Sequence, residues 1–196
     1  MDIVPVDTRY VPLTQQRWCC VPTCIQIVMY RHNIPLVPAE VIGYHLGLTV
    51  PQEDLQYFWN GRTGEEPVAG WGTQISKPEY SPNAAFEKLK IPLKMELMLI
   101  DGFADEDEFR EYLGGVEDSD KDVLVCFDYG TLYDTDYHSG HVCVLDRVYL
   151  ERGKMRLIDT EYKSPKWREI EIDKMFKAMK THGNLKSGGF WELKKI

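Results

Sequence analysis

The chain has 196 residues, of which 43% are hydrophobic, and a net charge of −8 at pH 7. This length can bury one core but not several, so we predict a single globular domain over residues 1–196. The negative charge argues against nucleic acid as a partner, because a duplex would be repelled by most of the surface. No apolar run is long enough to span a bilayer, and we expect no membrane partner.

The first residues of the chain and its cysteine content indicate in which cellular compartment the protein is located. The first residues, MDIVPVDTRYVPL, lack the basic start and apolar block of a secretion signal. Five cysteines are an odd number, and free thiols in a reducing environment are the simpler interpretation. We therefore expect a cytoplasmic protein without a disulfide framework, and the sequence leaves its oligomeric state open.

Helical patterns dominate the first half of the chain. In VPTCIQIVMYRHNI the apolar residues recur at helical spacing and Pro22 fits a first turn, which predicts a helix over residues 20–33. Residues 61–82 are rich in Gly, Pro and polar side chains and are expected to form a long surface loop around Trp71. Three further short helices, each with a proline in its first turn, are predicted over residues 38–48, 51–61 and 81–91.

The second half of the chain changes to short β-branched and apolar runs separated by turns. Before this change, a strand is predicted over residues 93–100 and a helix over residues 104–115. Helices first and a mostly antiparallel sheet afterwards indicate an α+β fold. The later strands are predicted over residues 122–130, 140–150, 154–162, 167–173 and 188–196, with a helix over residues 173–183.

The stretch TQQRWCCVPTC contains three cysteines with different prospects. Cys24 lies within an apolar helical pattern, so we expect it to pack in the core, as we do Cys126 and Cys143. Cys19 and Cys20 lie where the helix begins. A helix N-terminus favours a thiolate, and its N–H groups can hold the oxyanion of a tetrahedral intermediate. A cysteine in this place is a candidate nucleophile.

A base and an orienting group are available downstream. His141 begins one predicted strand, and Asp159 ends the next one. An antiparallel hairpin brings the start of its first strand beside the end of its second. Cys20, His141 and Asp159 would then supply the nucleophile, base and orienter of thiol catalysis.

A zinc site is the alternative use of these residue types. Structural zinc sites commonly pair two Cys-x-x-Cys units, and Cys19, Cys20 and His141 do not have that spacing. We predict no metal and no cofactor.

Taken in order, these residues resemble the papain-like cysteine peptidases of the bacteriocin-processing, double-glycine-leader type. That family has a Gln before a Cys-Gly-Pro-Ala segment, a His before an apolar strand and an Asp-Pro after the next strand. The resemblance implies Cys20 as nucleophile, with His141 and Asp159 completing the triad. It also implies that Gln15 or Gln16 stabilises the oxyanion.

The chain departs from that pattern at several positions. Val21 replaces the Gly after the nucleophile, Thr160 replaces the Pro after the Asp, and neither glutamine has the family's six-residue offset from Cys20. In a second register, which matches WCCV to a Trp-Cys-Trp-Ala variant, Cys19 would be the nucleophile. Pro22 in the first helical turn favours the register with Cys20.

The function that this resemblance implies is a papain-like thiol hydrolase, with a nucleophile helix packed on a C-terminal sheet. Its substrate would be a peptide or protein, cleaved at a peptide or isopeptide bond. The same triad would also support acyl transfer or deamidation, because an acyl-thioester can be resolved by water or by an amine. The departures leave a third possibility, a catalytically silent peptide-binding module.

Overall fold

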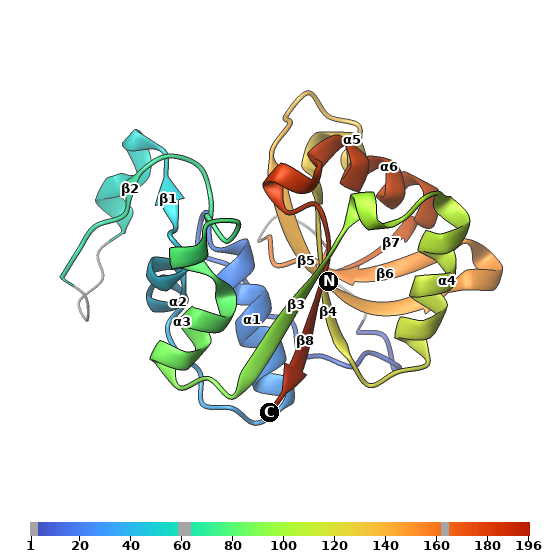
Figure 1. Ribbon diagram of the computed structural model, residues 1–196, viewed down its shortest axis with the longest axis horizontal. Coiled ribbons are helices and arrows are strands. Elements are labelled where there is room, and N and C mark those ends of the chain that lie inside the picture. The colour runs from blue at the N-terminus through green and yellow to red at the C-terminus, as the bar shows by residue number, and fades with distance from the viewer. Residues whose placement is uncertain (1–3, 59–63, 162–164) are drawn as a thin grey trace.

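The computed structural model describes residues 4–58, 64–161 and 165–196. A six-stranded sheet separates two groups of helices, as Figure 1 shows. On one face lie α1 (Cys20–Arg31), α2 (Ala39–His45) and α3 (Pro82–Leu89). On the other face lie α4 (Glu106–Glu117), α5 (Tyr129–Tyr133) and α6 (Ile172–His182). Each face of the sheet has its own apolar core. This arrangement confirms the predicted α+β fold.

The sheet has the strand order β3-β8-β4-β5-β6-β7, and every neighbouring pair is antiparallel. The predicted hairpin between the two strands that carry His141 and precede Asp159 is present as β5 and β6. The strands are β3 (Leu93–Leu99), β4 (Asp122–Asp128), β5 (Gly140–Tyr149), β6 (Lys154–Ile158), β7 (Trp167–Glu171) and β8 (Gly189–Lys195).

Helix α1 is buried along most of its length. Eight of its twelve residues are buried, and they pack between β5 and helix α2. The helix ends at Arg31 rather than at residue 33, because Asn33 adopts a left-handed φ of 55° and the next N–H, that of Ile34, bonds back to the carbonyl of Met29.

The segment predicted as a long loop contains more order than its composition indicates. Strand β2 (Val68–Ala69) pairs in parallel with β1 (Thr49–Val50), and a 3₁₀ turn, η2, covers Pro78–Tyr80. Thr49 and Gly72 exchange two backbone hydrogen bonds of 2.9 Å each. These bonds hold the segment around residue 72 beside the start of helix α1, where it forms one wall of the cavity described below.

One predicted element changes type, and another ends earlier than predicted. The helix predicted over residues 51–61 is a 3₁₀ helix, η1 (Gln52–Tyr57), and residues 59–61 of that prediction lie outside the described residues. The strand predicted to reach residue 130 ends at Asp128, because the Asp128 carboxylate accepts a 2.7 Å hydrogen bond from the Thr131 N–H and caps the short helix α5. The other 3₁₀ turns are η3 (Ile100–Gly102), η4 (Leu150–Arg152) and η5 (Asn184–Lys186).

A buried carboxylate ties the C-terminal end of α1 to the sheet. Asp122, at the start of β4, is 1% exposed and accepts hydrogen bonds from the Tyr10 hydroxyl at 2.8 Å and from the Arg31 guanidinium at 2.5 Å. His32 Nε2 contacts its second oxygen. Because these partners belong to the N-terminal segment, helix α1 and its C-cap, one side chain joins three parts of the chain.

Removing that carboxylate is expected to destabilise the protein. Asp122→Ala leaves the buried Tyr10 hydroxyl and the half-buried Arg31 guanidinium without their acceptor, and we expect a loss of about 3 to 5 kcal/mol in the free energy of unfolding. Asp120→Ala is the matched control, since Asp120 also pairs with Arg31 but its side chain is 89% exposed. The control should lose less than about 1 kcal/mol in urea denaturation. Equal losses in the two variants would contradict the assigned role of Asp122.

Candidate active site

Three elements bring the predicted triad residues to one place. Cys20 is the first residue of α1, His141 is the second residue of β5, and Asp159 directly follows β6. The register of the hairpin pairs Val144 with Ile158, so its open end carries both His141 and Asp159. Helix α1 packs across β5, which sets its first residue beside the same end of the sheet.

His141 and Asp159 form a buried pair. The Nε2 atom of His141 lies 2.9 Å from Oδ1 of Asp159, and the two residues are 6% and 0% exposed. Asp159 also accepts from the Glu161 N–H at 3.0 Å and from the Tyr133 hydroxyl at 3.3 Å, and Arg168 lies 3.3 Å away. Burial alone would raise the pKa of Asp159, but His141, the Glu161 N–H and Arg168 together lower it to about 2. The carboxylate is therefore charged at neutral pH.

Cys20 is the next member of this chain of contacts. The cysteine is half-buried, and its thiol lies close enough to His141 to raise the pKa of the imidazole. Since Nε2 of the imidazole faces Asp159, Nδ1 is the ring nitrogen that remains for the thiol. Burial alone would lower the pKa of His141, but its contacts with Cys143, Asp159 and Cys20 outweigh burial and raise the pKa well above its ordinary value. The imidazole is therefore suited to holding the proton of Cys20.

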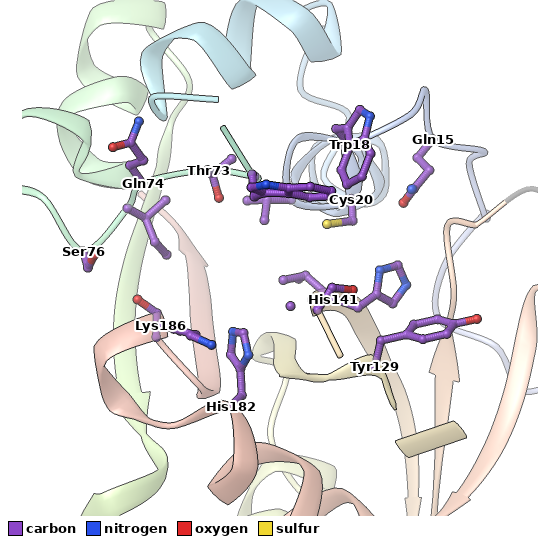
Figure 2. A pocket seen from close by; sticks show the side chains of 18 of the residues that line it. Gln15, Trp18, Cys20, Thr73, Gln74, Ser76, Tyr129, His141, His182 and Lys186 are labelled. Carbon is purple, nitrogen blue, oxygen red and sulfur yellow. The ribbon is translucent and has the colours of Figure 1, made fainter. Parts of the chain in front are cut away.

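Cys20 and His141 lie at a cavity of about 850 Å³. Figure 2 shows their side chains meeting it from the α1 side and the β5 side. Its walls come from the turn before α1, from the segment around residue 74 and from the end of α6. A cavity of this size and mixed polarity can hold several residues of an extended peptide.

The two candidate glutamines have different surroundings. Gln15 lines the cavity, and its amide accepts from the Thr160 hydroxyl at 2.6 Å and donates to Glu161 at 3.3 Å. The amide of Gln16 instead donates to Glu40 at 2.8 Å, and Gln16 is not among the residues that line the cavity. Only Gln15 is brought beside Cys20 and His141.

The turn before the helix is strained and aromatic. Trp18 has a left-handed φ of 64°, which is unusual for a bulky side chain. Its indole N–H donates to the carboxylate of Asp54 at 2.7 Å, and its ring packs edge-on against that of Trp71 at 5.1 Å. Both tryptophans line the cavity. The strained turn sets the direction in which the chain enters α1, and therefore the position of Cys20.

The remaining cysteines have their side chains in apolar surroundings. Cys19 is fully buried with Leu48 and Phe58, away from the two large cores, and burial raises the pKa of its thiol. Cys24 and Cys126 are buried in the core under α1, as predicted, and burial raises the pKa of each. Among the five thiols, Cys20 alone lines the cavity. This placement supports the register with Cys20.

Cys143 lies closer to the pair than its predicted role as a core residue implies. It is fully buried on the α6 face of the sheet, and its sulfur lies within 4.8 Å of a ring nitrogen of His141. Burial raises the pKa of Cys143 to about 12, so it remains a thiol at neutral pH. Alternation along β5 puts residues 141 and 143 on the same face, and this period of two could have revealed the contact from the sequence.

Within the described residues, one group has donor atoms close enough to hold a metal ion. A ring nitrogen of His141, the sulfur of Cys143 and a carboxylate oxygen of Asp159 all lie within 4.8 Å of one another. The zinc alternative used a different set, Cys19, Cys20 and His141, and the buried apolar setting of Cys19 does not favour it. The hydrogen bond of His141 to Asp159 and its contact with Cys20 already account for the orientation of the imidazole.

Comparison with known proteins gives a likeness of fold. No protein-family model matches the chain, and no curated protein matches it. A crystal structure described as that of a candidate C39-like peptidase from Bacillus anthracis superimposes with a TM-score of 0.52 at 14% sequence identity, over 95% of each chain. The chain therefore shares the fold of that protein. In the described residues, no helix is both long and apolar enough to cross a bilayer.

The His141 and Asp159 pair predicts how stability depends on pH. The pKa of Asp159 is about 2 in the folded protein and about 3.8 in the unfolded chain. Its contribution to the free energy of unfolding is therefore complete above about pH 4 and is lost as the pH falls toward 2. The pKa of His141 is raised, so its contribution is complete below about 6.5 and is lost as the pH rises through the folded value. The pair should stabilise most between about pH 4 and 6.5.

Urea denaturation of the wild type and of His141→Gln tests this dependence. The difference in unfolding free energy between the two proteins should shrink by up to about 2 kcal/mol between pH 5 and pH 2, because protonation of Asp159 removes its interaction with the imidazolium. The full value is an upper bound, since the Glu161 N–H and Arg168 also lower the pKa of Asp159 and remain in the variant. A difference that stays constant over this range would contradict the ionised pair.

Proposed function

We propose that the protein is a cysteine peptidase that cleaves a peptide or isopeptide bond with Cys20 as nucleophile. The observation that carries the proposal is the continuous set of contacts from Asp159 through His141 to Cys20 at the wall of one cavity. The shared fold with a C39-like peptidase supports it. The buried thiol of Cys143 has no comparable access, because it does not line the cavity.

Each group has a role in this reaction. His141 takes the proton of Cys20, and the thiolate attacks the substrate carbonyl. Asp159 keeps the imidazole in its orientation and stabilises its charged form. The protonated imidazole then gives its proton to the leaving amine, and water resolves the thioester with His141 acting again as base.

The oxyanion of the tetrahedral intermediate would be held at the N-terminus of α1. The first N–H groups of a helix have no intrahelical acceptor, and Cys20 is the first residue of α1. Gln15 is the side-chain donor that lies beside this point. Its contacts with Thr160 and Glu161, which follow Asp159, tie the proposed donor to the same loop as the triad acid.

Two other outcomes use the same site. Acyl transfer or deamidation would follow if an amine, or a side-chain amide, took the place of the water or of the peptide bond. A peptide-binding module without activity would keep the cavity and lose the reactivity of Cys20. The contact between Cys20 and His141 at the cavity wall favours chemistry over binding alone. All five cysteines are free thiols, which is in keeping with the cytoplasmic location that we propose.

Alkylation distinguishes an active thiol from a passive one. Under native conditions iodoacetamide should modify Cys20 before the other four cysteines, because those four are buried and their pKa values are raised. Mass spectrometry of tryptic peptides reads out the order. His141→Ala should slow the labelling of Cys20. Equal labelling of all five cysteines in the folded protein would contradict the proposal.

Turnover should depend on Cys20. Cys20→Ala should reduce cleavage of a fluorogenic peptide library to the background rate, because it removes the only proposed nucleophile. Cys19→Ala is the control for a change in the same turn. Cys19→Ala should retain turnover if Cys20 is the nucleophile. If Cys19→Ala loses turnover while Cys20→Ala retains it, Cys19 is the nucleophile instead.

The glutamines offer a matched pair of variants. Gln15→Ala should lower kcat by about a hundredfold, because it removes one oxyanion donor. Gln16→Ala removes an amide that contacts Glu40 outside the cavity and should change kcat less than about twofold. Steady-state kinetics on one peptide measure both, and a larger effect at Gln16 would contradict the assignment of Gln15.

A further inference from the structure

The cavity has two ends that differ in charge. Figure 2 shows Gln15 on one side of the Cys20 and His141 pair, and Gln74, Ser76, His182 and Lys186 on the other. We call the second side the lysine end. It is formed by residues 73–77 and by residues 182–187, which follow α6 or end it.

The acidic groups that line the cavity already have partners. Asp54 is bonded to the indole N–H of Trp18 and paired with Arg17 at 3.1 Å. Glu161 accepts from Gln15, at the opposite side from the lysine end. Among the described residues, no other Asp or Glu lines the cavity.

The lysine end carries positive charge that no carboxylate of the described residues pairs with. Lys77 donates to the side-chain oxygen of Gln74, which is neutral. In the described part of the chain, neither Lys77 nor Lys186 pairs with a carboxylate. Unpaired ammonium groups at a substrate cavity are notable in a chain with a net charge of −8.

We propose that the lysine end binds a carboxylate of the peptide substrate, with Lys77 and Lys186 as the groups that recognise it. This inference rests on the proposed peptidase function and adds its substrate class, a peptide with an acidic group within a few residues of the scissile bond. The two lysines reach the cavity from different segments, so an extended peptide held between the walls can meet both.

His182 supports this assignment by remaining neutral. Burial lowers its pKa first, and the nearby charge of Lys186 lowers it further. Its ring also packs closely over Gly140, where an added Cβ would lie 2.7 Å from the ring. The ring is thus a fixed neutral surface beside residue 141, and the charge that selects a substrate comes from the lysines.

The overall negative charge of the protein does not prevent this recognition. At physiological ionic strength, charges more than about 8 Å apart are largely screened. A carboxylate within the cavity therefore responds mainly to the nearest ammonium groups. One exposed ion pair strengthens binding by up to about fivefold, so two pairs give up to about 25-fold, and we expect about tenfold discrimination against an uncharged isostere.

A positional peptide library tests the proposal. The probes are internally quenched peptides, acetylated and amidated at their ends, in which each position in turn carries Glu, Gln or Lys. At one position on one side of the scissile bond, the wild type should cleave the Glu peptide about tenfold faster in kcat/KM than the Gln peptide. The preference should fall in 0.5 M NaCl, since salt screens exposed charges.

Charge reversal identifies the groups responsible. The double variant Lys77→Glu, Lys186→Glu should lose the preference for Glu and favour Lys at the same position. The matched control, Lys177→Glu together with Lys194→Glu, makes the same change of charge at exposed residues that do not line the cavity. It should retain the preference. Circular dichroism melting curves verify that both double variants are folded.

A further pair of probes separates two sources of the carboxylate. Neutral peptides with a free C-terminus or an amidated one show whether the lysine end takes a terminal carboxylate rather than a side chain; a tenfold preference for either source supports the proposal. Equal rates for Glu and Gln at every position, with no preference for a free terminus, overturn it. A preference for the acidic peptide that survives in the Lys77 and Lys186 double variant also overturns the proposal.

The proposal and the peptidase function can fail separately. Fluorescence anisotropy measures binding of the same peptides, labelled at one end, to Cys20→Ala, which binds without turnover. If the wild type cleaves none of the peptides, the peptidase function fails, and tenfold tighter binding of the Glu peptide still supports the lysine end. If the peptides are cleaved and bound without any preference for an acidic residue, the proposal that the lysine end binds a carboxylate fails, and the peptidase function stands.

Discussion

The burial of helix α1 is the constraint on which the site depends. A helix with eight buried residues cannot shift or rotate without exposing apolar surface, and its two ends are held by polar contacts. At the C-terminal end, Asp122 joins Arg31 to the sheet. At the N-terminal end, the backbone N–H of Gln15 donates to the carbonyl of Thr160 at 2.9 Å. The first residue of the helix, Cys20, therefore has a defined place relative to the loop after β6.

The electrostatics of the site follow from which groups that constraint buries. Asp159 is fully buried yet charged, since a histidine, a backbone N–H and an arginine all favour its ionised form. Its charge favours a protonated imidazole at His141, and the imidazole contacts the one thiol that lines the cavity. The thiols at Cys19 and Cys143 lie in apolar surroundings where burial raises their pKa values. In the proposed reaction, burial and not residue type thereby confines nucleophilic attack to a single sulfur.

Much of this arrangement could be predicted from the sequence, because it depends on local patterns. The α+β order follows from periodicity, and the meeting of His141 and Asp159 follows from the geometry of one hairpin. The proximity of Cys143 to His141 was missed because an apolar pattern predicts burial without naming the neighbours. The separate surroundings of Gln15 and Gln16 could not be predicted, since they depend on Thr160 and Glu40, which lie far away in the chain. The pairing of Val68 and Ala69 with residues 49 and 50 depends on similar long-range contacts.

The position of strand β8 has a consequence for when the site can form. This last strand is not at the edge of the sheet but lies between β3 and β4, and it pairs with seven residues of β3 and five of β4. During synthesis the N-terminal residues emerge first, so Cys20 leaves the ribosome long before the strand that completes the sheet. Until residues 189–195 have been added, β3 and β4 lack their shared neighbour and the core beneath α1 lacks Trp191 and Leu193. The order of synthesis thus delays assembly of the thiol site until the rest of the chain is in place.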